Sequence, residues 1–111
     1  MSKGILLIST VSSEEDAEKI ARHLVERKFA ACVNVIPKIT SFYFWQGKLQ
    51  KDSELLLLIK TIKDMEEMII DEVKRIHPYQ VPEVLSFDIE NGLEEYINWM
   101  MSSVSHENRG K

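Results

Sequence analysis

The sequence predicts an α+β fold, an antiparallel sheet with helices packed against it. Short apolar runs such as residues 5–8 and 55–59 are typical of buried strands. Two other segments repeat apolar residues every three or four positions, as amphipathic helices do. The two kinds of segment alternate along 111 residues, a length typical of one domain. We therefore predict a single domain over residues 1–111, with the polar residues 102–111 as a frayed tail.

A strand and a helix are predicted at the start of the chain. Residues 5–10 form the strand. Ser12 and Glu15 follow at the spacing of a capping box, which predicts that a helix begins there. One side of this helix is apolar and consists of Ala17, Ile20, Ala21, Leu24 and Val25.

A long hairpin follows this helix. Residues 30–45 form its first arm, interrupted at Pro37, a residue that strands tolerate at an edge or a bulge. Gln46-Gly47 make the turn, and residues 49–61 form the second arm. An unbroken register places Lys60 opposite Val33 and Glu54 opposite Ile39, and a bulge at Pro37 shifts this pairing.

The last third of the chain predicts a helix, a strand and a further helix. Asp64 caps the first of these helices, which ends at His77 because Pro78 disfavours helical backbone before it. A strand lies within residues 81–89, and Asn91-Gly92 precede the last helix.

The order of elements is strand, helix, strand, strand, helix, strand, with one helix added. This order is that of the ferredoxin-like βαββαβ fold. Right-handed crossovers place both main helices on one face of a four-stranded antiparallel sheet. The other face of the sheet then needs a cover.

The length of the hairpin predicts self-association. Each arm reaches about 40 Å at roughly 3.3 Å per residue, whereas a domain of this size has a radius of gyration of about 13 Å. The overhanging end carries the aromatic residues 42–45, which would invite aggregation if they stayed exposed. A closed ring of subunits covers them. In the alternative, Pro37 breaks the strand and the tip folds back.

Five segments stand at consistent spacing: Ala30-Ala31-Cys32-Val33-Asn34, residues 41–48, Ile59-Lys60-Thr61, His77-Pro78-Tyr79-Gln80-Val81-Pro82-Glu83, and Tyr96-Ile97-Asn98-Trp99. With these segments the chain resembles the CutA divalent-cation tolerance family, over residues 5 to about 101. The resemblance implies a ferredoxin-like homotrimer in the cytoplasm, with a role in tolerance to copper and other divalent metals. It also implies clefts between subunits, as in the similarly arranged PII signalling proteins.

The resemblance carries over only part of a metal site. Bacterial members with a proposed copper site have a cysteine near the end of the first strand and two adjacent histidines before the Pro-Tyr pair. This chain has Ser9 and Ile76 at two of these positions, and only His77 matches. His77 is therefore the single candidate ligand for a divalent metal such as copper, and tight copper sites use several ligands at once.

Six residues are candidates for a cleft that binds a ligand. For each the structural alternative stays open: a buried cysteine, a helix-capping histidine, solvated charges at a strand end, or an aromatic packing residue. The six candidates are Cys32, Trp45, Glu54, Lys60, His77 and Tyr79.

Composition restricts the partners of the chain. The net charge of −4 and the absence of a basic patch argue against nucleic-acid binding. No apolar run reaches the roughly 20 residues that span a bilayer, and neither a signal peptide nor a disulfide is expected, so we predict a cytoplasmic protein.

The sequence favours a trimeric metal-response or regulatory binding protein and not an enzyme, since no catalytic motif stands out. Two alternatives stay open. One is a PII-like sensor that binds a small anionic ligand between subunits, and the other is an enzyme with a cleft between subunits.

Overall fold

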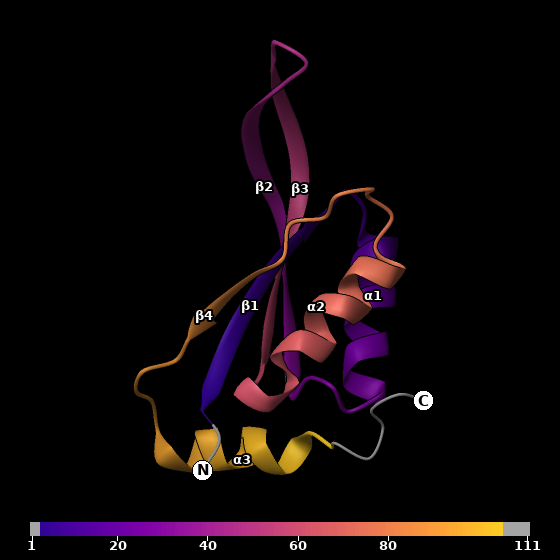
Figure 1. Ribbon diagram of the computed structural model, residues 1–111. Coiled ribbons are helices and arrows are strands. Elements are labelled where there is room, and N and C mark those ends of the chain that lie inside the picture. Colours follow the sequence, from indigo (N-terminus) through magenta and orange to yellow (C-terminus); the bar gives the residue numbers. More distant parts are fainter. Residues whose placement is uncertain (1–2, 106–111) are drawn as a thin grey trace.

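A computed structural model describes residues 3–105 of the chain, and its four strands form one antiparallel sheet in the order β2-β3-β1-β4. This topology confirms the ferredoxin-like α+β fold with an added C-terminal helix (Figure 1). The elements are β1 (Gly4–Val11), α1 (Glu14–Glu26), β2 (Cys32–Trp45), β3 (Lys48–Ile62), a 3-10 turn (Lys63–Met65), α2 (Glu66–Ile76), β4 (Leu85–Asp88) and α3 (Glu94–Ser103).

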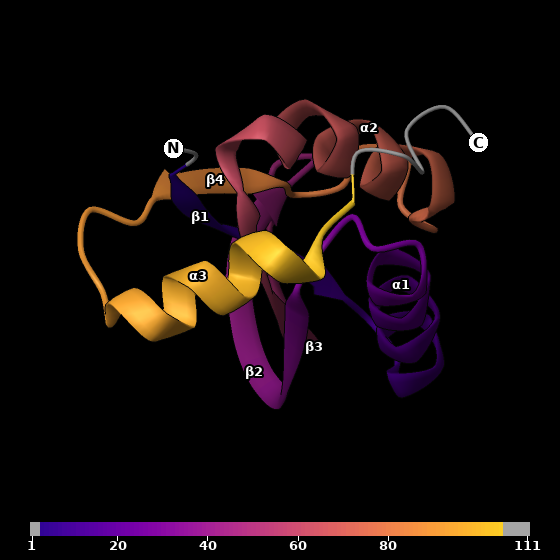
Figure 2. The same ribbon diagram turned by 90° about the horizontal axis from the view of Figure 1, so that it is seen from below.

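The hydrophobic core lies between one face of the sheet and the helices α1 and α2. Both helices cover the same face, as right-handed crossovers require (Figure 2). Alternate residues of β1 and β3 point into this layer, because successive side chains of a strand face opposite ways. The fully buried side chains of the core include Ile5, Leu7, Ile20, Leu24, Leu57, Ile59, Ile69 and Val73.

The opposite face of the sheet has little cover within the described part of the chain. Its middle carries Ile8 and Leu58, which lie opposite each other and are only half-buried. At its edge Leu85 is 51% exposed and Phe87 is 50% exposed. Helix α3 crosses only the lower end of the sheet (Figures 1 and 2). We call this surface the open face.

The hairpin of β2 and β3 extends well beyond the rest of the fold (Figure 1). Pairing continues to Trp45 opposite Lys48, and Gln46 and Gly47 close the turn with positive φ angles of 51° and 75°. The tip therefore does not fold back at Pro37. Overall extents of 46 × 31 × 21 Å reflect this overhang. At the tip, Phe44 is 73% exposed.

A β-bulge between Ile36 and Ile39 sets which side chains face one another. Glu54 lies opposite Ile39 as the unbroken register predicts, whereas Lys60 lies opposite Cys32 and not Val33, the shift expected for a bulge at Pro37. The extra residue of β2 is taken up at the bulge, which shifts the register by one position.

Lys38, within this bulge, has a left-handed φ of 60°. Between the bulge and the turn the pairing is unbroken, so Tyr43 and Trp45, and not Phe42 and Phe44, share a face with Glu54.

The ends of the helices differ from the sequence prediction by one or two residues. Ser13 and not Ser12 caps α1, because its Oγ accepts the N–H of Asp16 at 3.1 Å. The predicted cap Asp64 lies within the 3-10 turn, and α2 begins at Glu66 without a side-chain cap.

The ends of α2 and α3 also bear on the predictions. Helix α2 ends at Ile76, with His77 as its C-cap, as predicted. Residues 102 and 103 belong to α3 and not to a frayed tail, and the predicted tail at 106–111 lies outside the described residues. Among residues 3–105, none of the helices has the length and apolar character needed to cross a membrane.

Candidate binding site at the base of the hairpin

His77 joins the end of α2 to the end of β1. Only 7% of its surface is exposed. The ring Nδ1 accepts the backbone N–H of Tyr79 at 3.0 Å, so the hydrogen is on Nε2, which donates to the Thr10 carbonyl at 2.8 Å. The imidazole therefore does not serve the last carbonyls of α2. It holds the segment after α2 against β1 and fixes where Tyr79 lies.

Tyr79 and Glu54 form a partly buried hydrogen-bonded pair. The Tyr79 hydroxyl donates to Glu54 Oε2 at 2.8 Å, and Glu54 is only 9% exposed. The Tyr79 ring lies against that of His77, with 4.6 Å between centroids. Burial first, and then the bond to Glu54, raise the pKa of Tyr79 to about 12, although a bond with Ser12 opposes them. Tyr79 is thus a fixed hydrogen-bond donor at neutral pH.

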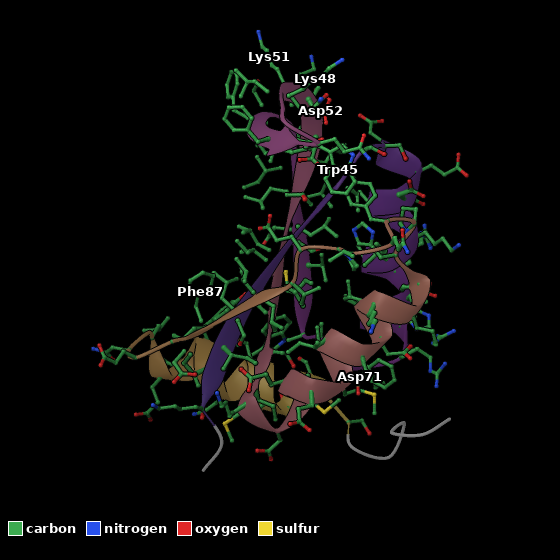
Figure 3. All side chains as sticks on the ribbon, turned by 45° about the horizontal axis from the view of Figure 1, so that its top comes forward. Trp45, Lys48, Lys51, Asp52, Asp71 and Phe87 are labelled. Atoms are coloured by element: carbon green, nitrogen blue, oxygen red, sulfur yellow. The ribbon has the colours of Figure 1, made fainter. Side chains whose placement is uncertain are left out.

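The aromatic side chains of the distal hairpin face this pair across a surface hollow. Tyr43 and Trp45 project from β2 and are 42% and 63% exposed. The Tyr43 hydroxyl donates to Asp52 on β3, which raises the pKa of Tyr43. Figure 3 places Trp45, Lys48 and Asp52 at this end of the hairpin. The hollow has a volume of about 540 Å³ and is lined by Thr10, Tyr43, Trp45, Tyr79, Gln80, Val81 and Glu83.

Cys32 and Lys60 lie elsewhere on the sheet. They face each other at the lower end of the hairpin, six positions along β3 from Glu54, a distance of about 20 Å. Lys60 Nζ lies 5.7 Å from the Tyr96 ring centroid, and Cys32 Sγ lies 3.8 Å from Asn34 Oδ1. Cys32 is half-buried, not enclosed in the core.

The six predicted site residues therefore fall into two groups in one chain. His77, Tyr79 and Glu54 are joined by hydrogen bonds and ring contact, and Tyr79 and Trp45 line the same hollow. Cys32 forms a second group with Lys60, on the open face. A single cleft containing all six residues would need more than one subunit.

The described residues contain no group of three or more His, Cys, Asp or Glu side chains that could hold a metal. Both ring nitrogens of His77 already have partners, so a metal at either nitrogen would displace a hydrogen bond. Ser9 is fully buried, and its hydroxyl finds no hydrogen-bond partner among residues 3–105. Ile76 packs against the core.

Sequence reasoning missed several residues around the hollow. Tyr43 alternates with Trp45 along β2, so its place was available from strand periodicity. The two residues share a face with Glu54 because the pairing is unbroken from the turn to Ile39, and this follows from a turn at Gln46-Gly47. Glu83 belongs to the segment His77-Pro78-Tyr79-Gln80-Val81-Pro82-Glu83 but was not chosen as a site residue, and Asp52 belongs to none of the five segments.

Fold and site together define a class of protein. It is a small ferredoxin-like protein with an overhanging hairpin and a hollow lined by aromatic side chains and Glu83. The model of the family described as "CutA1 divalent ion tolerance protein" matches residues 5–103. The chain belongs to this family.

Relatives and solved structures agree with this assignment. The divalent-cation tolerance protein CutA of Thermus thermophilus is 46% identical over 95 residues, which cover 86% of this chain and 92% of the relative. A CutA homolog of Xenopus laevis is 50% identical over 91 residues, 82% of this chain but only 60% of the longer frog protein. The crystal structure of CutA1 from Ehrlichia chaffeensis superposes with a TM-score of 0.91 at 30% identity, covering 95% and 98% of the two chains.

Two further relatives bear on location. A protein CutA of Arabidopsis thaliana, 42% identical over 90% of this chain and 55% of its own length, is named as chloroplastic. A CutA structure from Archaeoglobus fulgidus is described as periplasmic, with a TM-score of 0.88, 38% identity, and coverage of 92% of this chain and 99% of its own. Family membership therefore does not fix one compartment.

Proposed function

We propose that this chain is a homotrimeric binding protein of the copper and divalent-cation response, and that the hollow at the base of the hairpin is its ligand site. The observation that carries this proposal is the hydrogen-bonded unit of His77, Tyr79 and Glu54 beside an exposed hollow. Partly buried polar groups fixed next to a concave aromatic surface are typical of ligand sites.

The open face and the hairpin support self-association. Phe42, Phe44 and Leu49 form the far side of the hairpin tip and are 63%, 73% and 63% exposed. Leu85 and Phe87 leave a further apolar area uncovered on the open face. Contiguous apolar patches of this kind mark protein interfaces. A ring of three chains would cover both, because each hairpin can lie on the sheet of the next subunit.

The fold alone does not say whether the chain binds copper, regulates a response to it or catalyses a reaction. Relatives are named for divalent-cation tolerance, and no relative reported above is named for a reaction. We therefore propose binding and regulation, not catalysis. We place this chain in the cytoplasm. That compartment is reducing, so Cys32 would stay a free thiol there.

A cell-based experiment tests the tolerance role. A bacterial host without its own CutA protein would express the wild-type chain or Trp45→Leu, and its growth would be followed in graded copper(II). We expect the wild type, but not the variant, to restore growth at copper levels that stop the host. If the wild type gives no advantage, the proposed role in copper tolerance is wrong.

Calorimetry with copper(II) tests direct metal contact. Tight binding at a whole-number ratio per trimer, lost in His77→Ala, would make His77 a ligand despite its two hydrogen bonds. Weak binding that the variant leaves unchanged would remove His77 from the metal-binding role. The response would then pass through another ligand at the hollow.

One observation favours a second candidate function, a sensor of an anionic ligand between subunits. Lys60 is half-buried on the open face and forms no ion pair among the ion pairs found within residues 3–105. A neighbouring subunit that covered it would leave a desolvated ammonium group, which needs an anion. Thermal-shift measurements with nucleotides and 2-oxo acids, on wild type and Lys60→Gln, test this alternative.

A further inference from the structure

Three aromatic side chains line the hollow at the base of the hairpin, and two of them are exposed. Tyr43 and Trp45 stand two positions apart on one strand face, about 7 Å from each other along β2. Tyr79 reaches the same hollow from the segment after α2. The ring contacts and cation contacts found among the described residues do not involve Tyr43 or Trp45. Within one chain Tyr43 is 42% and Trp45 is 63% exposed, so part of each ring is open to a ligand.

The charges around the hollow favour a cation. Of the lining residues that the structure describes, Glu83 alone has a formal charge. Behind the two tyrosines lie Glu54 and Asp52, each of which accepts a phenolic hydrogen bond. Both phenol hydrogens are therefore engaged, and neither is free to donate to an anionic ligand. An anion would meet three carboxylates here.

Two lysines lie near the hollow without lining it. Lys48 is opposite Trp45 at the hairpin tip. Lys74 lines the neighbouring hollow that shares Gln80 and Val81 with this one. Their ammonium groups extend into solvent from exposed side chains, so they leave the aromatic faces open.

The donor set does not suit a metal ion. Among the described residues, Glu83 is the single carboxylate on the lining, and none of their imidazoles or thiols lines the hollow. Calcium and magnesium require several oxygen ligands, and copper prefers nitrogen or sulfur. Aromatic faces instead attract weakly hydrated cations through the ring quadrupole, most strongly for tryptophan. A volume of about 540 Å³ lies within the range of sites for small organic molecules.

We infer that the hollow formed by Tyr43, Trp45, Tyr79 and Glu83 binds a small organic ammonium ion, with its charged group against the Tyr43 and Trp45 rings and within the field of Glu83. This inference rests on the proposed function in taking the hollow as the ligand site. It names the ligand class as an alkylammonium cation. The hydrogen bonds from Tyr43 and Tyr79 to carboxylates hold both rings in place and increase their electron density.

Three probes of the same branched shape but different charge test this inference on the full chain. They are tetramethylammonium as the cation, tert-butanol as the uncharged control and pivalate as the anion, at constant ionic strength. Proton–nitrogen NMR would follow the Trp45 indole N–H, identified by its loss in Trp45→Leu. We expect saturable shifts with tetramethylammonium, and a response to the other two probes that is at least about tenfold weaker.

Two variants locate the charge. Glu83→Gln should weaken tetramethylammonium binding about threefold or more, since it removes the lining carboxylate without changing its shape. Glu90→Gln, an exposed carboxylate next to α3, is the matched control and should leave binding unchanged. Equal binding of tert-butanol, stronger binding of pivalate, or no shift with tetramethylammonium would each overturn the inference.

The molar mass of the same samples by light scattering separates this inference from the proposed trimer. Ammonium binding by a chain that is not trimeric would support the ligand class and contradict the proposed assembly. A trimer that does not bind the cation would contradict the ligand class alone.

Discussion

Replacement of Tyr79 by phenylalanine tests the reasoning about the site most sharply. The change removes one hydroxyl and leaves the Glu54 carboxylate, which is 9% exposed, without its 2.8 Å donor. A hydrogen bond to a charged group contributes about 1.5–3 kcal/mol. The rise of the Tyr79 pKa from 10.0 to about 12 corresponds to at most about 3 kcal/mol between phenol and phenolate.

We expect Tyr79→Phe to lower the free energy of unfolding by about 2 kcal/mol at neutral pH, since Tyr79 keeps partial contact with solvent. Because the folded-state pKa of Tyr79 is raised, its contribution is fully present below pH 10. It is lost as the pH rises from 10 to about 12. The difference between wild type and Tyr79→Phe should therefore shrink over this interval.

Urea denaturation at matched protein concentration, at neutral and alkaline pH, measures this difference. Tyr96→Phe is the matched control, because among the hydrogen bonds found within residues 3–105 none involves the Tyr96 hydroxyl. It should change stability by less than about 0.5 kcal/mol. If Tyr79→Phe is no more destabilising than Tyr96→Phe, the Tyr79–Glu54 bond does not hold the site together.

Three other substitutions test local features of the fold by urea or acid denaturation. Glu72→Gln should cost about 1–2 kcal/mol at neutral pH, because Arg75, and less strongly His23, hold the pKa of Glu72 at about 2 despite its burial. This contribution is present above pH 4.5 and lost as the pH falls towards 2, so a pH-independent difference would contradict it. Ser9→Ala should leave stability unchanged or raise it by up to about 1 kcal/mol, because the Ser9 hydroxyl is buried without a partner, and a clear loss of stability would show a partner. Lys38→Gly should stabilise by about 0.5 kcal/mol by relieving the left-handed φ of 60° in the bulge, and a loss of stability would argue against strain there.

Periodicity predicted the elements well, because it reflects burial on one side of each helix or strand. The alternation of apolar runs and helical spacing predicted the order of elements along the chain and, through it, the ferredoxin-like fold. The cap of α1 is Ser13 and not the predicted Ser12. Both hydroxyls suit a cap, and the choice depends on which residue has the extended backbone just before the helix. The start of α2 was missed because the 3-10 turn at 63–65 has no distinct sequence signature.

The site was predicted only in part because it depends on long-range register. His77 and Tyr79 are close in sequence, so their contact follows from a local turn. The pairing of Tyr79 with Glu54 joins residues 25 positions apart and needs the exact course of the chain. Cys32 and Lys60 were expected near the same cleft, but a strand is rigid and keeps Lys60 away from Glu54.

The mass of the chain in solution tests the central claim most directly. Sedimentation equilibrium at low micromolar concentration should give three times the chain mass of 12.9 kDa, because the open face and the hairpin tip each need a neighbour. The doubly substituted chain Phe44→Ser, Leu49→Ser should shift this equilibrium towards single chains. A wild-type chain that sediments as a monomer of 12.9 kDa would contradict the proposed assembly.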